Sequence, residues 1–163
     1  MGIGRAIATT LAKEGVRLAV MARRRNLLEE LERELGQKLV IIECDFLKAD
    51  SVEKISGASL TGLGSVDILV NNAGGSRRFT LESNDAQWEE ALTLNFVRQR
   101  QLAHALLPQM IERKWGRIVN ITGKSEPEGL NGAFCAKAAV HSWAKGLSRE
   151  VGKHGITVNC IPP

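Results

Sequence analysis

Two glycines near the start of the chain, Gly2 and Gly4, flank Ile3 at the point where a helical repeat of apolar residues begins. Glycine in the first turn of a helix lets an anionic group approach the backbone N–H groups at the positive end of the helix dipole. Gly2, Ile3 and Gly4 are therefore candidates for binding the phosphates of a nucleotide. Glycines also serve helix packing alone, so the motif by itself leaves both functions open.

A second candidate group follows the apolar run 16–21, where Arg23 and Arg24 stand. In a dinucleotide-binding sheet this position meets the adenosine ribose, where an acidic residue binds a free 2'-hydroxyl and arginine suits a 2'-phosphate. No acidic residue occurs here before Glu29. The arginines therefore favour NADP over NAD as the cofactor, with ordinary surface arginines at a strand end as the alternative.

Polar and small residues also follow the next two apolar runs. Asp45 and Phe46 come directly after one of them, and Asn72, Ala73 and Gly74 come after the other. Adjacent asparagines before small residues are costly in a core but useful in a tight turn against a ligand. A turn without a ligand accounts for them equally well.

The elements that must position these residues alternate between two periodicities. Helical spacing is found at 3–15, 27–36, more weakly from Ser51, and in two long stretches at 86–113 and 132–153. Apolar runs typical of strands lie at 16–21, 39–44, 66–70, 116–122 and 156–161. This alternation predicts an α/β fold in a single domain over residues 1–163: a Rossmann-type, doubly wound parallel sheet with helices on both faces. Ligands of such sheets bind outside the carboxyl ends of the strands, where the candidate residues stand.

Composition argues against several classes of protein. Of the 163 residues, 44% are apolar and 25% are charged, and the apolar runs are strand-sized, so we expect a core-forming protein without a membrane span. Because no secretory signal opens the chain, the expected location is cytoplasmic. Three cysteines without a Cys-x-x-Cys pair or clustered histidines predict reduced thiols and no metal site. A net charge of +4, 4% aromatic residues and no Tyr argue against nucleic acid as a partner.

The motifs become specific through their order along the chain. The order is Gly2-Ile3-Gly4, Asn71-Asn72-Ala73-Gly74, Leu94-Asn95-Phe96, Gly116-Arg117-Ile118-Val119-Asn120-Ile121, Lys137-Ala138-Ala139 and Gly155-Ile156-Thr157-Val158-Asn159. It resembles the short-chain dehydrogenase/reductase family, in the branch that includes the 3-oxoacyl-acyl carrier protein reductases. The resemblance covers essentially the whole chain. It implies a Rossmann-type fold and hydride transfer between NAD(P)H and the carbon of a carbonyl or secondary alcohol.

The resemblance also implies roles for single residues. The positions that match the family's cofactor site are Gly2, Ile3 and Gly4 at the pyrophosphate, Asp45 and Phe46 beside the adenine, Asn72, Ala73 and Gly74 along the cleft, and Lys137 at the nicotinamide ribose. The positions that match its catalytic set are Asn95 and Lys137. In the family, a Tyr four residues before the Lys moves the proton and a Ser after the preceding strand binds the substrate oxygen.

The chain departs from the family pattern at both of these last positions. Ala133 stands four residues before Lys137, and Gly123 stands where the family has its Ser. Ser125, two residues later, is the candidate for the hydroxyl role, with a plain loop residue as the alternative. The polar segment 124–128 is either a source of a substitute acid or a solvated loop. We expect an oxidoreductase, and the alternative is a catalytically impaired nucleotide-binding pseudoenzyme or a fragment.

The two ends of the chain give a further expectation. The family's first, central strand belongs before Met1, and further elements belong after Pro163, so the Rossmann domain is expected to be incomplete. The strands at 16–21 and 66–71 would then have no shared neighbour. A small carbonyl or alcohol is the expected substrate, of unspecified identity. The long helices at 86–113 and 132–153 are expected to form a homodimer or homotetramer.

Overall fold

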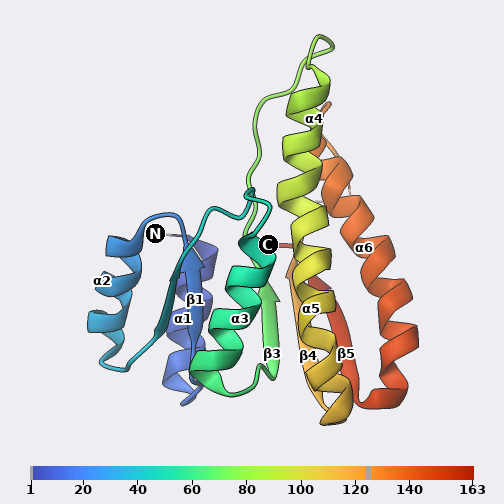
Figure 1. Cartoon of the computed structure of the whole chain (residues 1–163). Helices are drawn as coiled ribbons and strands as arrows, with labels where there is room; N and C mark the ends of the chain where they lie inside the picture. Colours follow the sequence, from blue (N-terminus) through green and yellow to red (C-terminus); the bar gives the residue numbers. More distant parts are fainter. Residues whose placement is uncertain (1, 124–125) are drawn as a thin grey trace. The chain divides into compact units, whose positions relative to one another are not determined.

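The computed structural model describes residues 2–123 and 126–163, and Figure 1 shows the course of the chain. The chain divides into two compact units, Met1–Val66 and Asp67–Pro163, which are described in turn. All strand pairs are parallel, and helices alternate with strands along the chain. The predicted α/β class with a parallel sheet is confirmed.

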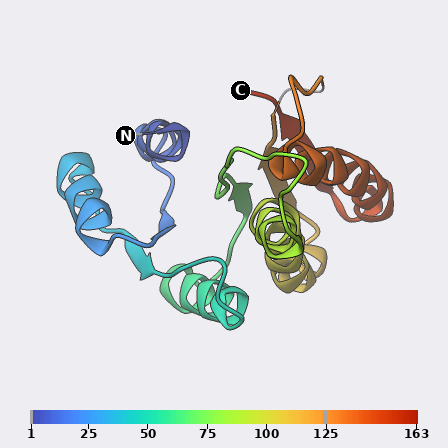
Figure 2. The ribbon, with the colours of Figure 1, turned by 90° about the horizontal axis from the view of Figure 1, so that it is seen from above.

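The first unit contains three helices and two strands. In order they are α1 (Ile3–Lys13), β1 (Ala19–Ala22), α2 (Arg25–Leu35), β2 (Val40–Glu43) and α3 (Ser51–Leu63). Figure 2 shows α1 and α2 on one face of the two strands and α3 on the other. The core between α1, α2 and the strands is formed by Ala8, Leu18, Leu31 and Leu39. The strands β1 and β2 are parallel and pair from Ala19–Val40 to Ala22–Glu43, so their carboxyl ends lie at the same edge.

The second unit contains a sheet of three strands in the order β3, β4, β5. The strands are β3 (Ile68–Asn71), β4 (Gly116–Ile121) and β5 (Ile156–Ile161), so β1 and β3 belong to different sheets. The helices are α4 (Asp85–Leu92), α5 (Arg98–Glu112) and α6 (Gly132–Val151). Met110, Ile118 and Val140 are fully buried, and they come from α5, β4 and α6 respectively. The core of this unit therefore lies between its sheet and its two long helical segments.

The long helix expected at 86–113 is interrupted by a different helical geometry. Between α4 and α5 lies a π-helical segment, η1 (Thr93–Val97), so the three segments follow one another without a loop. A capping box between Asn84 and Gln87 starts α4. A single-turn π segment inserts one extra residue into an α-helix and is frequently found at functional sites. Asn95 lies in the middle of this one.

The strand expected at 16–21 begins later, at Ala19. The backbone N–H of Val16 donates to the carbonyl of Leu11 at 3.1 Å, and Gly15 has a φ of +76°. Val16 thus completes the end of α1, in the manner of helices that close on a left-handed glycine. Within the described residues, no helix combines the length and apolarity needed to cross a membrane.

Candidate cofactor and catalytic site

Lys137 lies in α6 and reaches the carboxyl end of β4. Its Nζ donates to the backbone carbonyl of Ile121 at 2.8 Å and to Oε1 of Gln99 at 3.4 Å. The side chain is half-buried, and loss of hydration lowers the pKa of Lys137 from 10.5 to about 8, against a smaller opposing effect of Cys160 on β5. The structure therefore holds a partly desolvated amine at the edge where ligands of parallel sheets bind.

Asn95 fixes the turn that follows β3. From the π segment, its Nδ2 donates to the carbonyls of Gly75 and Ala91, both at 2.9 Å, and its Oδ1 accepts from the N–H of Gly75 at 3.1 Å. The side chain is only 2% exposed. Asn95 thus satisfies both backbone groups of Gly75, as a neighbouring strand would, and holds the turn against the helix.

Gly74 is required in this turn by the close approach of Asn95. A Cβ at Gly74 would lie 2.8 Å from Asn95 Oδ1 and 3.7 Å from Lys137 Nζ. The first distance is too short for any real Cβ, whereas the second is ordinary contact. Gly74 is therefore the point at which the turn, Asn95 and Lys137 meet.

Gln99 is a residue of this site that the sequence analysis missed. It is fully buried in α5; its Nε2 donates to the carbonyl of Ala73 at 2.5 Å and its Oε1 accepts from Lys137. Gln99 thus connects the turn after β3 with the lysine. The available signal was its position four residues after Asn95, which places both side chains on one helix face.

A row of buried amides crosses the sheet just below the turn. Asn71 Nδ2 donates to Asn120 Oδ1 at 2.9 Å, and Asn120 Nδ2 donates to the carbonyl of Asn159 at 3.3 Å. Asn71 is 3% exposed and Asn120 is fully buried. Asn72 follows with a half-buried side chain, and its N–H donates to the carbonyl of Val70 at 3.1 Å. The two bonds of the Asn120 side chain tie the carboxyl ends of β3, β4 and β5 together.

The candidate phosphate-binding residues lie in the first unit. Gly2 is the N-cap of α1 without a side-chain cap, Ile3 is exposed and Gly4 is half-buried. Because no side chain of α1 itself caps these N–H groups, they stay available for an anion.

Arg23 and Arg24 follow β1 and are exposed, and among the described residues neither forms an ion pair. The next arginine is engaged, since Arg25 pairs with Glu29 at 2.7 Å. Arg24 is the N-cap residue of α2. Two guanidinium groups without an ion pair in the described part of the chain thus stand beyond the carboxyl end of a strand, with a positive helix end beside them.

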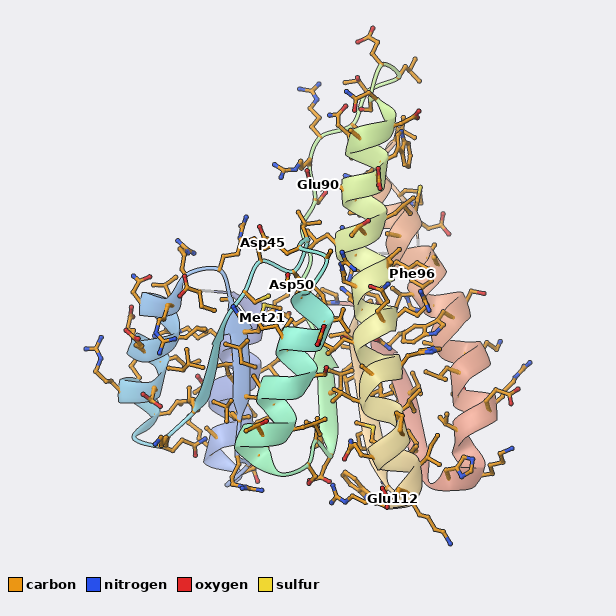
Figure 3. The ribbon with its side chains drawn as sticks, viewed as in Figure 1. Met21, Asp45, Asp50, Glu90, Phe96 and Glu112 are labelled. Atoms are coloured by element: carbon orange, nitrogen blue, oxygen red, sulfur yellow. The ribbon has the colours of Figure 1, made fainter. Side chains whose placement is uncertain are left out.

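Asp45 and Phe46 follow β2 and differ in exposure. Asp45 is half-buried, and its Oδ1 accepts from the N–H of Leu47 at 3.1 Å; Figure 3 shows it beyond the end of the strand. Phe46 is 4% exposed, and its carbonyl accepts from Ser51 Oγ at 3.0 Å. The backbone here is thus held to the start of α3.

Comparison with known proteins identifies the family. The family profile described as "short chain dehydrogenase" matches residues 1–163. The chain belongs to the short-chain dehydrogenase family. Among curated relatives it is 32% identical to a 3-oxoacyl-[acyl-carrier-protein] reductase of Haemophilus influenzae, over 99% of this chain and 69% of that protein. The resemblance inferred from the motifs is therefore confirmed.

Solved structures of the family agree. A short-chain dehydrogenase from Streptomyces avermitilis superimposes with a TM-score of 0.92 and 30% identity, over 99% of this chain and 62% of that one. L-sorbose reductase from Gluconobacter frateurii, complexed with NADPH and L-sorbose, gives a TM-score of 0.90 at 32% identity, over 99% and 65%. The chain thus spans a little under two thirds of the length of these two structures.

Ala133 and Gly123 stand where the family resemblance implies the proton-transfer residues. Ala133 lies in the first turn of α6, is 7% exposed, and its N–H donates to Asn131 Oδ1 at 2.8 Å. Gly123, two residues after β4, is half-buried. Ser125 lies outside the described residues. The structure therefore brings together Asn95, the turn at 72–75 and Lys137, and adds Gln99 to them.

Proposed function

We propose that this protein is an NAD(P)-dependent oxidoreductase that transfers hydride between a nicotinamide cofactor and a small carbonyl compound or secondary alcohol. The observation that carries the proposal is the hydrogen-bonded cluster at the carboxyl end of β4, in which Ile121, Gln99 and the turn after β3 surround the amine of Lys137. Within this family, such a lysine beside an Asn-Asn-Ala-Gly turn belongs to the cofactor cleft.

The residues of each unit fit parts of a dinucleotide. In the first unit, the uncapped start of α1 at Gly2, Ile3 and Gly4 would take the pyrophosphate. Arg23 and Arg24 would take a 2'-phosphate, because their guanidinium groups are exposed and unpaired among the described residues. Asp45 and Phe46 would flank the adenine. We therefore propose NADP as the preferred cofactor. One similar structure, L-sorbose reductase from Gluconobacter frateurii, is complexed with NADPH.

In the second unit, Asn72, Ala73 and Gly74 would line the cleft and Lys137 would hold the nicotinamide ribose. Bound NADPH supplies the hydride. Asn95 and Gln99 keep the turn and the lysine in fixed relation through their hydrogen bonds. The lysine donates hydrogen bonds to whatever occupies the cleft, since its ammonium carries three N–H groups.

Proton transfer is the weak step of the proposed mechanism. The methyl group of Ala133 neither donates nor accepts a proton, and Gly123 has no side chain. This observation favours a second candidate function, a pseudoenzyme that binds the nucleotide without turnover. We propose that carbonyl reduction is slow if the chain is an oxidoreductase and does not occur if it is a pseudoenzyme.

A turnover assay separates the two functions. NADPH oxidation is followed against a panel of ketones and aldehydes, with NADPH binding followed by its fluorescence in the same samples. Slow but catalytic oxidation that a Lys137→Met variant loses supports the oxidoreductase. Binding without turnover supports the pseudoenzyme, and absence of both refutes the proposal.

Assembly, location and domain limits complete the proposal. We propose a homodimer or homotetramer formed through the helical segments at 86–113 and 132–153, and a single Rossmann-type domain over residues 1–163. The three cysteines are free, which suits the reducing conditions of a cytoplasmic location.

A further inference from the structure

The segment that continues from the turn after β3, residues 75–80, is tied to the helices around it; Figure 1 shows it between β3 and α4. Its first residue, Gly75, is bound through both of its backbone groups. Asn131, the N-cap residue of α6, donates from Nδ2 to Ser76 Oγ at 2.8 Å and to the carbonyl of Arg77 at 3.2 Å. The backbone up to Arg77 is therefore held against the start of α6.

Phe79 anchors the other end of this segment. Its side chain is 8% exposed, and its ring meets the ring of Trp88 on α4 edge-on, with the centroids 4.8 Å apart. A Cβ at Gly132, the first residue of α6, would lie 2.7 Å from the ring of Phe79, so the ring packs directly against the helix backbone there. The residues on both sides of Arg78 are thus fixed, Arg77 by a hydrogen bond and Phe79 by packing.

The two arginines of the segment differ in their partners. Arg77 pairs with Glu90 on α4, and its Nε donates to Oε1 of Glu90 at 2.8 Å. Figure 3 shows Glu90 on this helix. Arg78 is exposed, and no ion pair within residues 2–123 and 126–163 involves it. Glu90 therefore compensates the charge of Arg77, whereas Arg78 carries a cation on an anchored backbone beside the start of α6.

We propose that Arg78 is a specificity-determining residue that binds a carboxylate of the substrate, and that the substrate is a short aliphatic oxo acid. This role rests on the oxidoreductase function proposed above. A guanidinium group binds a carboxylate through two parallel N–H donors. Asn131, which holds the segment, stands six residues before Lys137, about 9 Å along a helix. Since the proposed cofactor site centres on Lys137, we expect the carboxylate a few carbons away from the carbonyl group.

The anchored backbone and the helix beside it both favour an anion at Arg78. An anchored backbone reduces the conformational freedom that the arginine loses when a ligand binds. The positive end of the α6 dipole lies at the same place, because Asn131 is the N-cap of this helix of 20 residues. A neutral ketone of the same size gains from neither feature, so the carboxylate should raise the affinity of the substrate.

Protection of Arg78 from chemical labelling tests its role without any turnover. The chain is treated with phenylglyoxal, which modifies arginine, and the modified residues are mapped by peptide mass spectrometry. We expect saturating 4-oxopentanoate to slow the labelling of Arg78 by about fivefold or more, and pentan-2-one, the ketone without the carboxylate, to leave it unchanged. Arg149, exposed on α6, is the internal control. No protection of Arg78, or equal protection of Arg149, overturns the proposal.

Two matched variants test the same role in turnover. The quantity compared is kcat/KM for 4-oxopentanoate divided by kcat/KM for its uncharged methyl ester. We expect this ratio to fall by about fivefold or more in Arg78→Gln, mainly through KM, because the carboxylate binds away from the reacting carbonyl. Arg77→Gln, which loses only the pair with Glu90, should keep the wild-type ratio. An unchanged ratio in Arg78→Gln, or an equal fall in both variants, contradicts the proposal.

A cofactor titration keeps this role apart from the function proposed above. NADPH binding is followed by fluorescence in the samples used for labelling. Protection of Arg78 by 4-oxopentanoate without NADPH binding would support the carboxylate site and contradict the oxidoreductase. NADPH binding without protection of Arg78 would support the cofactor site and overturn the role of Arg78.

Discussion

Replacing Asn95 by alanine tests, through the stability of the protein, whether this side chain holds the turn after β3. The side chain makes three hydrogen bonds, two of them to Gly75 and one to Ala91. Each is worth about 1 kcal/mol net, but Gly75 is exposed and water replaces part of what its backbone loses. We therefore expect Asn95→Ala to lower the free energy of unfolding by about 2–3 kcal/mol, which corresponds to roughly 4–12 °C in Tm for a chain of this size.

Urea unfolding followed by circular dichroism measures this loss, and hydrogen exchange locates it. The N–H of Gly75 should lose protection in Asn95→Ala, because Oδ1 no longer accepts from it. Glu89→Ala, an exposed position on α4, is the matched control and should change stability by less than about 0.5 kcal/mol. An Asn95→Ala variant as stable as this control, with Gly75 still protected, would refute the assigned role.

The Asn95→Asp variant tests which hydrogen bonds the Asn95 side chain donates and which it accepts. Asn95→Asp keeps an acceptor for the Gly75 N–H, but it sets a carboxylate against the carbonyl oxygens of Gly75 and Ala91. We expect it to be less stable than Asn95→Ala at pH 7 and to recover on acidification, since a protonated carboxyl can donate. Stability that falls further with acid, relative to Asn95→Ala, would contradict the arrangement.

Three other changes have defined outcomes. The folded chain releases the Lys137 proton near pH 8 and the unfolded chain near pH 10.5. The free energy of unfolding, measured with urea and compared with that of Lys137→Met, should therefore rise by about 1–3 kcal/mol between these two pH values. A free-energy difference from Lys137→Met that does not change with pH would contradict the desolvated lysine. Arg23→Ala should weaken NADP binding about tenfold to a hundredfold by calorimetry while leaving NAD binding unchanged. Ala133→Tyr combined with Gly123→Ser should raise ketone turnover by about a hundredfold or more, and no gain in a folded double variant would count against position 133 as the missing acid.

The helices and strands were largely predictable from periodicity because each buries one face. The last strand, β5, has the predicted bounds 156–161. The π segment within the helical stretch was not predictable, since one extra residue in a turn shifts the apolar repeat only locally. The predicted start of β1 was also wrong, because the backbone N–H of Val16 bonds to the end of α1. A backbone hydrogen bond of this kind cannot be read from the pattern of side chains.

The site was predictable only in part, and Gln99 shows why. Asn95 and Lys137 came from the family motif, whereas a glutamine in a long helix is typical of an exposed face. Its burial depends on Ala73 and Lys137, which lie 26 and 38 residues away in sequence. Partners at such separations are set by tertiary packing, and no local periodicity reports them.

A titration of NADPH into the chain, without any substrate, shows whether the cofactor site is present. We expect the chain to bind its cofactor even though Ala133 and Gly123 stand where the family resemblance implies the proton-transfer residues. The expected result is saturable binding of one NADPH per chain, tighter than that of NADH. Absence of saturable binding by either cofactor, with the chain shown to be folded by circular dichroism, would contradict it.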